Sequence, residues 1–223
     1  MKMASWFISA AAVVALAGAA HAAPMYNWTG VYVGAVGGYT WSHSAPTYDD
    51  AMLQAVFPLA PLNARGASGG IEGGYNHQFP NGFVLGLEGD VSIANVTATI
   101  PDDLGTFNHL GVPQTVTART DWVASLRGRA GFAMNNLLFY GTAGLTSSHV
   151  IVTATDGNLS DSATVGGWAL GAGIEKSLLQ HVSVKLEYIH SATGSHTWFP
   201  GQVYSNSGGS TAESVRAGIN LHY

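Results

Sequence analysis

Two carboxylates stand two residues apart in one of the most regular segments of the chain, at Glu88 and Asp90. On a β-strand they would face the same side about 7 Å apart, because a strand rises ~3.3 Å per residue. Such a pair can act as a general acid and base. Arg127 and Arg129 show the same spacing in a later segment. We favour ion pairing between the two pairs, because a buried charge without a partner is very costly.

The histidines offer a second kind of chemistry. His43, His109, His149 and His196 lie in or beside four different long loops, so they could converge above one rim of the molecule. Neutral imidazoles in such a cluster bind a transition metal or a haem iron. We favour the alternative, in which they are separate solvent-exposed side chains, and we therefore predict neither a metal site nor a cofactor.

Composition and motifs argue against several other functions. The chain contains no cysteine, which removes thiolate metal sites and cysteine nucleophiles. It carries neither an H-E-x-x-H motif nor a P-loop. Its net charge of −5 includes no basic block, so nucleic acid is not an expected partner. We predict that the protein is not an enzyme.

The charged residues belong to segments in which apolar and polar side chains alternate. Along 83–93, one parity carries Phe, Leu, Leu, Gly, Val and Ile, and the other carries Val, Gly, Glu, Asp and Ser. Such alternation predicts β-strands, and most of the segments have the ~9–11 residues that a tilted strand needs to cross a bilayer. The eight segments are 29–42, 67–79, 83–93, 122–132, 136–151, 164–177, 182–193 and 212–223.

The connections between these segments alternate in length. Short turns at one end and long loops at the other are typical of an up-and-down outer-membrane barrel. The sequence therefore predicts an all-β fold, an eight-stranded antiparallel transmembrane β-barrel with short periplasmic turns and four long extracellular loops. The short turns lie near 80–82, 135–136 and 179–181, and the long loops at about 43–66, 97–119, 153–163 and 194–211.

The charges help to choose between a membrane barrel and a soluble one. Only 9% of the residues are charged, too few to solubilise the outer wall of a soluble barrel, since ~25% is usual for a soluble domain. In a membrane barrel the same residues face a narrow lumen, where opposite charges neutralise one another. The predicted lumen ion-pair network comprises Glu72, Glu88, Asp90, Asp121, Arg127, Arg129, Glu175, Lys185, Glu187 and Arg216.

The N-terminal segment has the features of an export signal. Lys2 precedes an apolar run over 6–20, and Ala20-His21-Ala22 is an A-x-A cleavage site. We predict that residues 1–22 form a cleaved signal peptide and that residues 23–223 form an outer-membrane β-barrel domain. The protein is then expected in the cell outer membrane, in contact with lipid and lipopolysaccharide.

A set of short motifs, in order along the chain, resembles a known family. They are N-W-T-G-V-Y-V-G at 27–34, V-L-G-L-E-G-D at 84–90, L-R-G-R-A-G at 126–131, L-F-Y-G-T-A-G-L at 138–145 and V-R-A-G-I-N at 215–220. The chain is similar to the small porin-like outer-membrane proteins of alphaproteobacteria, often called outer-membrane immunogenic proteins, which have an OmpA-type eight-stranded barrel. The resemblance implies a structural, surface-exposed role, sometimes with small-solute passage or ligand binding.

The last segment ends on the alternating residues Ile219, Leu221 and Tyr223. Members of the family usually end in an aromatic residue, often Phe. The end of this chain resembles the signal that the barrel-assembly machinery reads, which implies that machinery as a partner during biogenesis.

Three functions remain open from the sequence. The first is a structural surface protein whose lumen is plugged by the ion-pair network. The second is a narrow passive porin for small solutes, whose conductance would change when Arg127 or Arg129 is made neutral. The third is a loop-borne binder of haem, a metal or an unknown extracellular ligand, which would depend on the four loop histidines.

Overall fold

The computed structural model describes residues 26–56, 59–102, 114–154, 159–202 and 205–223. The predicted signal peptide, residues 1–22, lies outside this set. Within the described ranges, no helix is long and apolar enough to cross a lipid bilayer.

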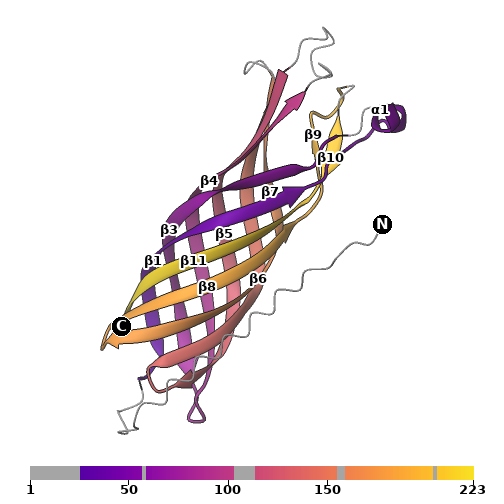
Figure 1. Cartoon of the computed structure of the whole chain (residues 1–223). Coiled ribbons are helices and arrows are strands. Elements are labelled where there is room, and N and C mark those ends of the chain that lie inside the picture. Colours follow the sequence, from indigo (N-terminus) through magenta and orange to yellow (C-terminus); the bar gives the residue numbers. More distant parts are fainter. Residues whose placement is uncertain (1–25, 57–58, 103–113, 155–158, 203–204) are drawn as a thin grey trace, which may run out of the picture.

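Eight strands close into one barrel, as Figure 1 shows. Every strand pairs antiparallel with its neighbours in chain order, and the last pairs with the first. The predicted all-β, up-and-down barrel is therefore confirmed. Its strands are β1 (Gly30–Ser44), β3 (Leu62–Gln78), β4 (Phe83–Asp102), β5 (Gln114–Met134), β6 (Leu137–Ala154), β7 (Leu159–Leu179), β8 (Val182–Thr193) and β11 (Ser210–His222).

Tight turns join the strands at one end of the barrel, where the C-terminus also lies (Figure 1). Between β3 and β4, Gly82 has a φ of 85°, a left-handed conformation that costs glycine little. Between β5 and β6, Asn135 has a φ of 56°, which asparagine tolerates better than most residues. An outer-membrane barrel turns this short-turn end toward the periplasm.

Four strands are much longer than a bilayer crossing requires. Strands β4 to β7 contain 18 to 21 residues, whereas ~9–11 suffice. The segments predicted as loops at 97–119 and 153–163 are therefore largely strand in their described parts, which corrects their expected extent. The extension has its own small core, because Val116 and Val152 pack with Trp198 and Phe199. Figure 1 shows the ends of β4 and β5 rising beyond the rest of the wall.

The first and fourth long loops join in a small structure outside the barrel. Strands β2 (Thr47–Tyr48), β10 (Asn206–Gly208) and β9 (His196–Trp198) form a three-stranded sheet, and the apolar part of the first loop contributes helix α1 (Ala51–Val56). The Asp49 carboxylate accepts hydrogen bonds from Ser205 at 2.5 Å and Ser207 at 2.7 Å. These two donors lower the pKa of Asp49 below its usual range.

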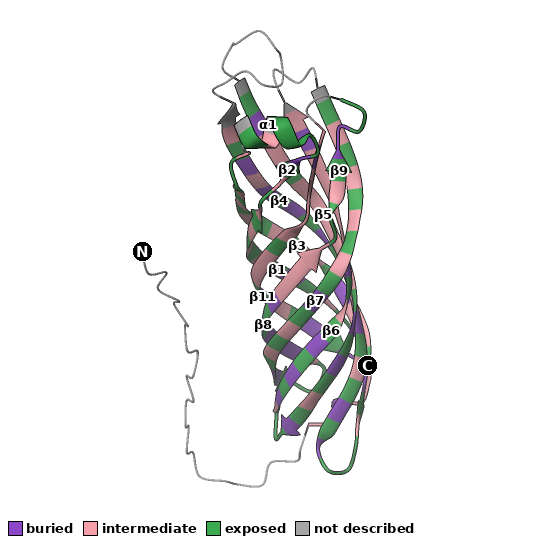
Figure 2. Ribbon diagram, turned by 90° about the vertical axis from the view of Figure 1, so that its right-hand side faces the viewer, coloured by how far each residue is buried: buried purple, intermediate pink, exposed green. Residues whose placement is uncertain are grey.

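Buried and exposed residues alternate along the strands (Figure 2). Large apolar side chains such as Ile71, Leu126 and Leu145 are exposed on the outer wall, as a lipid-facing surface requires. Exposed aromatic residues lie toward both ends of this wall. They include Phe79, Phe83, Phe132, Phe139 and Tyr223 toward the short turns, and Tyr39, Trp41 and Trp168 toward the long loops.

Candidate functional site

Arg127 stands at the centre of a group of charged side chains inside the barrel. Its guanidinium donates hydrogen bonds to Glu88 at 2.6 Å, Glu187 at 2.8 Å and Asp90 at 3.2 Å. It also donates to the Thr142 hydroxyl at 3.0 Å. Charge-assisted bonds of this kind are stronger than neutral ones, so one arginine ties β5 to strands β4, β6 and β8.

Two further cations extend the network across the lumen. Lys185 lies 2.5 Å from a Glu72 oxygen and 3.1 Å from Glu88. Arg216 donates to Glu187 at 3.0 Å and to Asp90 at 3.2 Å. The Arg216 side chain keeps 9% of its surface exposed, whereas that of Lys185 is fully buried. Solvent therefore reaches the network at Arg216 and not at its centre.

The network continues toward the short-turn end through Arg129. This guanidinium pairs with Glu175 and lies over the Tyr140 ring, 3.7 Å from its centroid. It also donates to the Tyr32 hydroxyl at 3.3 Å, which in turn donates to Glu88 at 2.8 Å. Cation–π contact and hydrogen bonding thus replace the water that the buried charge has lost.

The structure brings together nine of the ten residues predicted for the lumen. All nine are buried, and each lies within 4 Å of an opposite charge. They comprise five carboxylates and four cations, so one negative charge is in excess. Among the titratable side chains described near Glu175, His222 lies 3.3 Å away through Nε2.

Asp121 is the exception, and its assignment to the lumen network is wrong. It contacts His149 Nδ1 at 2.8 Å, and both side chains are partly exposed. His149 stacks on Trp122, which lies on the same parity of β5 as the exposed outer-wall residues Leu126 and Phe132. The register of β5 against β6 shifts between Thr120 and Trp122. This irregularity adds a residue to β5 and reverses the parity on which the prediction relied.

Glycines opposite inward tyrosines make the packed lumen possible. A Cβ added at Gly74 would lie 2.6 Å from the Tyr32 hydroxyl, and one at Gly173 would lie 2.6 Å from the Tyr140 hydroxyl. Sequence reasoning missed both tyrosines as lumen residues. The sequence does hold a signal for them. Each tyrosine lies on the polar parity of its strand, and a neighbouring strand carries a glycine on its own polar parity.

An aromatic group closes the lumen at the short-turn end. Trp28 precedes β1 and is fully buried in a cluster with Leu138 and Tyr140. Its ring contacts Tyr26 at a centroid distance of 4.7 Å and His222 at 5.6 Å. Sequence reasoning did not identify this closure, because Trp28 lies outside the alternating segment that would assign it a face.

The loop histidines do not converge where they are described. His43 contacts Asn63, His149 contacts Asp121, and His196 packs against Trp198. His109 lies outside the described residues. Within the described part of the chain, no group of three or more His, Cys, Asp or Glu side chains could hold a metal ion.

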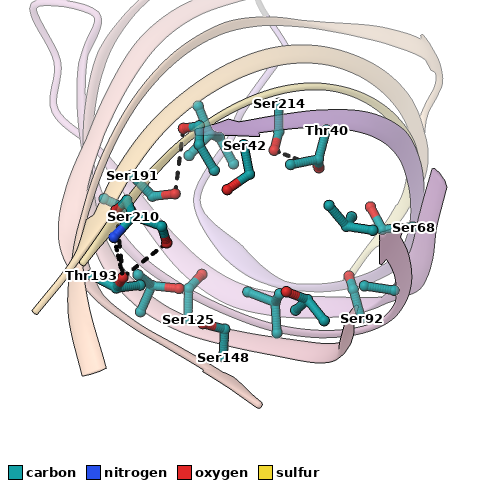
Figure 3. A pocket seen from close by; sticks show the side chains of 18 of the residues that line it. Thr40, Ser42, Ser68, Ser92, Ser125, Ser148, Ser191, Thr193, Ser210 and Ser214 are labelled. Atoms are coloured by element: carbon teal, nitrogen blue, oxygen red, sulfur yellow. Dashed lines mark hydrogen bonds between the residues drawn. The ribbon is translucent and has the colours of Figure 1, made fainter. Parts of the chain in front are cut away.

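A cavity of about 110 Å³ lies above the charged network, toward the long loops. Figure 3 shows its ring of serine and threonine side chains around an open centre. Asp90, Arg127 and Arg216 lie at its charged end. A second cavity of about 90 Å³ shares Ser42 and Thr193 with the first and reaches Trp198.

One catalytic-serine pattern occurs in the chain, G-x-S-x-G at 66–70. In a hydrolase this pattern marks a sharp turn between a strand and a helix. Here the whole pattern lies inside β3, and Ser68 is one of the cavity-lining residues. The geometry therefore lacks the strand-to-helix turn that the motif implies.

The predicted assembly signal lies on the outer wall. Ile219, Leu221 and Tyr223 are all exposed at alternate positions at the end of the chain, and Ile219 and Leu221 belong to β11, the strand that closes the barrel against β1.

Comparisons with known sequences agree with this architecture. The model of a family described as outer membrane protein beta-barrel domain matches residues 9–221. A 31 kDa outer-membrane immunogenic protein of Brucella melitensis biotype 1 is 32% identical over 202 residues, which cover 84% of this chain and 81% of that protein. A 22 kDa outer membrane protein of Rhizobium leguminosarum bv. viciae is 29% identical over 165 residues, which cover 74% and 64%.

Solved structures share the fold. Neisserial surface protein A aligns with a TM-score of 0.50 at 14% identity, covering 87% of this chain and 98% of that one. The outer membrane protease OmpT of Escherichia coli also aligns with a TM-score of 0.50, at 7% identity over 87% and 97%. At such identities the likeness concerns the barrel alone. Because the family match spans almost the whole sequence, this chain belongs to the outer-membrane β-barrel protein family, together with the outer-membrane immunogenic proteins of alphaproteobacteria, and its location is the outer membrane.

Proposed function

We propose that this protein is a structural, surface-exposed component of the outer membrane, that its lumen is plugged by the ion-pair network, and that it is not an enzyme. The observation that carries the proposal is the burial of nine charged side chains that contact one another from β3 to β11. An eight-stranded barrel has an interior that side chains just fill. Free passage of water and ions would require this network to separate.

The closure at the short-turn end supports the same proposal. Trp28, Leu138 and Tyr140 pack together there, and all three are buried. A solute that passed the charged network would next meet this apolar cluster. The two barriers differ in chemistry, so no single class of small solute is favoured at both.

Conductance in planar lipid bilayers tests the plug. We expect the folded protein to give no discrete single-channel steps. Steps in the unaltered protein that change in size in the Arg129→Met variant would overturn the plug and favour the narrow porin. Arg65→Met is the matched control, because Arg65 is exposed on the outer wall. Each preparation is first checked for a heat-dependent shift in gel mobility, which reports a closed barrel.

We also propose that residues 1–22 are removed on export and that the barrel-assembly machinery inserts the protein. Support for insertion by that machinery comes from the exposed, alternating Ile219, Leu221 and Tyr223 on the closing strand and at the chain end. N-terminal sequencing of the protein purified from outer membranes tests the cleavage site, which we expect after Ala22. Loss of heat-modifiable protein from membranes in a Tyr223→Ser variant is the result expected for the assembly signal.

A further inference from the structure

The cavity above the charged network is lined by hydroxyl groups from nearly every strand. Twelve serine and threonine side chains face it, and only β7 contributes none. They are Thr40, Ser42, Ser68, Ser92, Thr120, Ser125, Thr146, Ser148, Ser191, Thr193, Ser210 and Ser214. In Figure 3 many of these hydroxyls point toward the open centre. We call this space the hydroxyl chamber.

The chamber hydroxyls differ in how far they are paired with one another. Thr40 bonds with Ser214, and Thr193 bonds with Ser210. Ser92, by contrast, is 4% exposed, and its Oγ has no hydrogen-bond partner among the described residues. A buried hydroxyl without a partner is unfavourable, so the chamber is suited to an occupant that supplies several hydrogen bonds.

The charged end of the chamber selects against an ionic occupant. One Asp90 oxygen already accepts from Ser125, Arg127 and Arg216. Arg216 also donates to Glu187. Because each of these charges is already paired, an incoming ion would lose its hydration without meeting a free counter-charge. A neutral occupant avoids that cost.

The dimensions limit the occupant to a small molecule. A cavity of ~150 Å³ holds benzene, which has six non-hydrogen atoms. The hydroxyl chamber of about 110 Å³ is continued by the adjoining cavity of about 90 Å³. That second space is lined by Val96, Ala98 and Val152 among others, and it extends to Trp198. The C–H groups of an occupant fit this second, apolar cavity, and its hydroxyl groups fit the hydroxyl chamber.

We propose that the hydroxyl chamber binds a small neutral polyol of about six to ten non-hydrogen atoms, which enters from the long-loop side. Its hydroxyls bond to the serines that line the chamber, the unpaired Ser92 among them, and its carbon chain extends toward the apolar cavity. The partly exposed Arg216 marks how far solvent penetrates from that side. This binding does not require the network to separate, because the chamber lies on the long-loop side of Asp90, Arg127 and Arg216.

Saturation-transfer NMR on the detergent-folded protein, free of lipopolysaccharide, tests the proposal. The probe is erythritol, which has four hydroxyls, and the comparison is butane-1,4-diol, which lacks the two central ones. We expect erythritol to bind at least about five-fold more tightly, since each hydrogen bond is worth a few-fold in affinity. Equal binding of the two probes, or binding of neither, would overturn the proposal without involving any variant.

A pair of adjacent serines on β6 provides the matched control. Ser148 lines the chamber, whereas Ser147 lines a groove on the outer wall. We expect Ser92→Ala/Ser148→Ala to weaken erythritol binding at least about five-fold and Ser147→Ala to leave it within two-fold. Both proteins must show the heat-dependent gel shift. A double variant that is folded and binds erythritol as well as the unaltered protein would place the polyol elsewhere.

Discussion

Replacing Arg127 by methionine tests the energetic importance of the lumen network. The substitution keeps most of the side-chain volume and removes the cation that contacts Glu88, Asp90 and Glu187. Five buried carboxylates would then face three cations. Removing one partner of a buried ion pair costs about 3–5 kcal/mol, because the remaining charge stays buried without compensation. We expect Arg127→Met to lower the free energy of unfolding by about that amount.

Urea unfolding of the protein folded in lipid vesicles, followed by gel mobility and tryptophan fluorescence, measures this change. The matched control is Arg65→Met, which removes an exposed arginine and should cost less than about 1 kcal/mol. Adding Glu88→Gln to Arg127→Met should recover part of the loss, since it removes one of the unpaired charges. If Arg127→Met is no more destabilising than Arg65→Met, the network does not stabilise the barrel and the reasoning fails.

Three more predictions follow from single features. Gly74→Ala should cost about 1–3 kcal/mol, because an added Cβ would lie 2.4 Å from the Leu87 carbonyl oxygen and 2.6 Å from the Tyr32 hydroxyl. Gly37→Ala, with no neighbour closer than 3.8 Å, should be near neutral, and urea unfolding compares the two variants. Trp28→Ala should cost about 3–5 kcal/mol and increase fluorescent-dye access to the lumen from the short-turn end, and unchanged access would argue against the closure. The lowered pKa of Asp49 means that its bonds stabilise the loop sheet above the ordinary carboxyl pKa and are lost as pH falls through the lower folded pKa. Protection of the 206–208 amides, measured as the exchange rate relative to the intrinsic rate at each pH, should therefore fall when the pH is lowered from about 7 to below the ordinary aspartate pKa of about 3.9. The loss is expected in the unaltered protein but not in Asp49→Asn.

The barrel could be predicted from the sequence because a strand encodes its two faces locally. In 83–93 large apolar side chains and a glycine occupy one parity, polar residues and a glycine occupy the other, and Val84 is the single exception. Val84 is itself informative, because it is fully buried in the aromatic closure at the short-turn end. Side-chain parity thus identifies which face a residue occupies, and not which neighbours it meets.

The remaining errors have the same physical origin. Parity counted from Arg127 places Asp121 on the inner face, but the register shift beside Trp122 reverses that placement. No local pattern marks that shift. The strand extensions have a Thr-rich, weakly alternating sequence, which predicts loops. In the structure they are strands, because Trp198 and Phe199, which are distant in the chain, pack against Val116 and Val152. Such contacts depend on closure of the whole barrel.

The closure at the short-turn end also constrains the order of assembly. Trp28 comes before the first strand and His222 lies in the last, yet their rings are in contact beside the seam where β1 meets β11. A chain made from its N-terminus therefore has no complete partner set for Trp28 until its final strand has arrived. The contact between these rings therefore forms only once the last strand of the barrel is in place. A chain truncated before β11 would leave both the seam and this end of the lumen open.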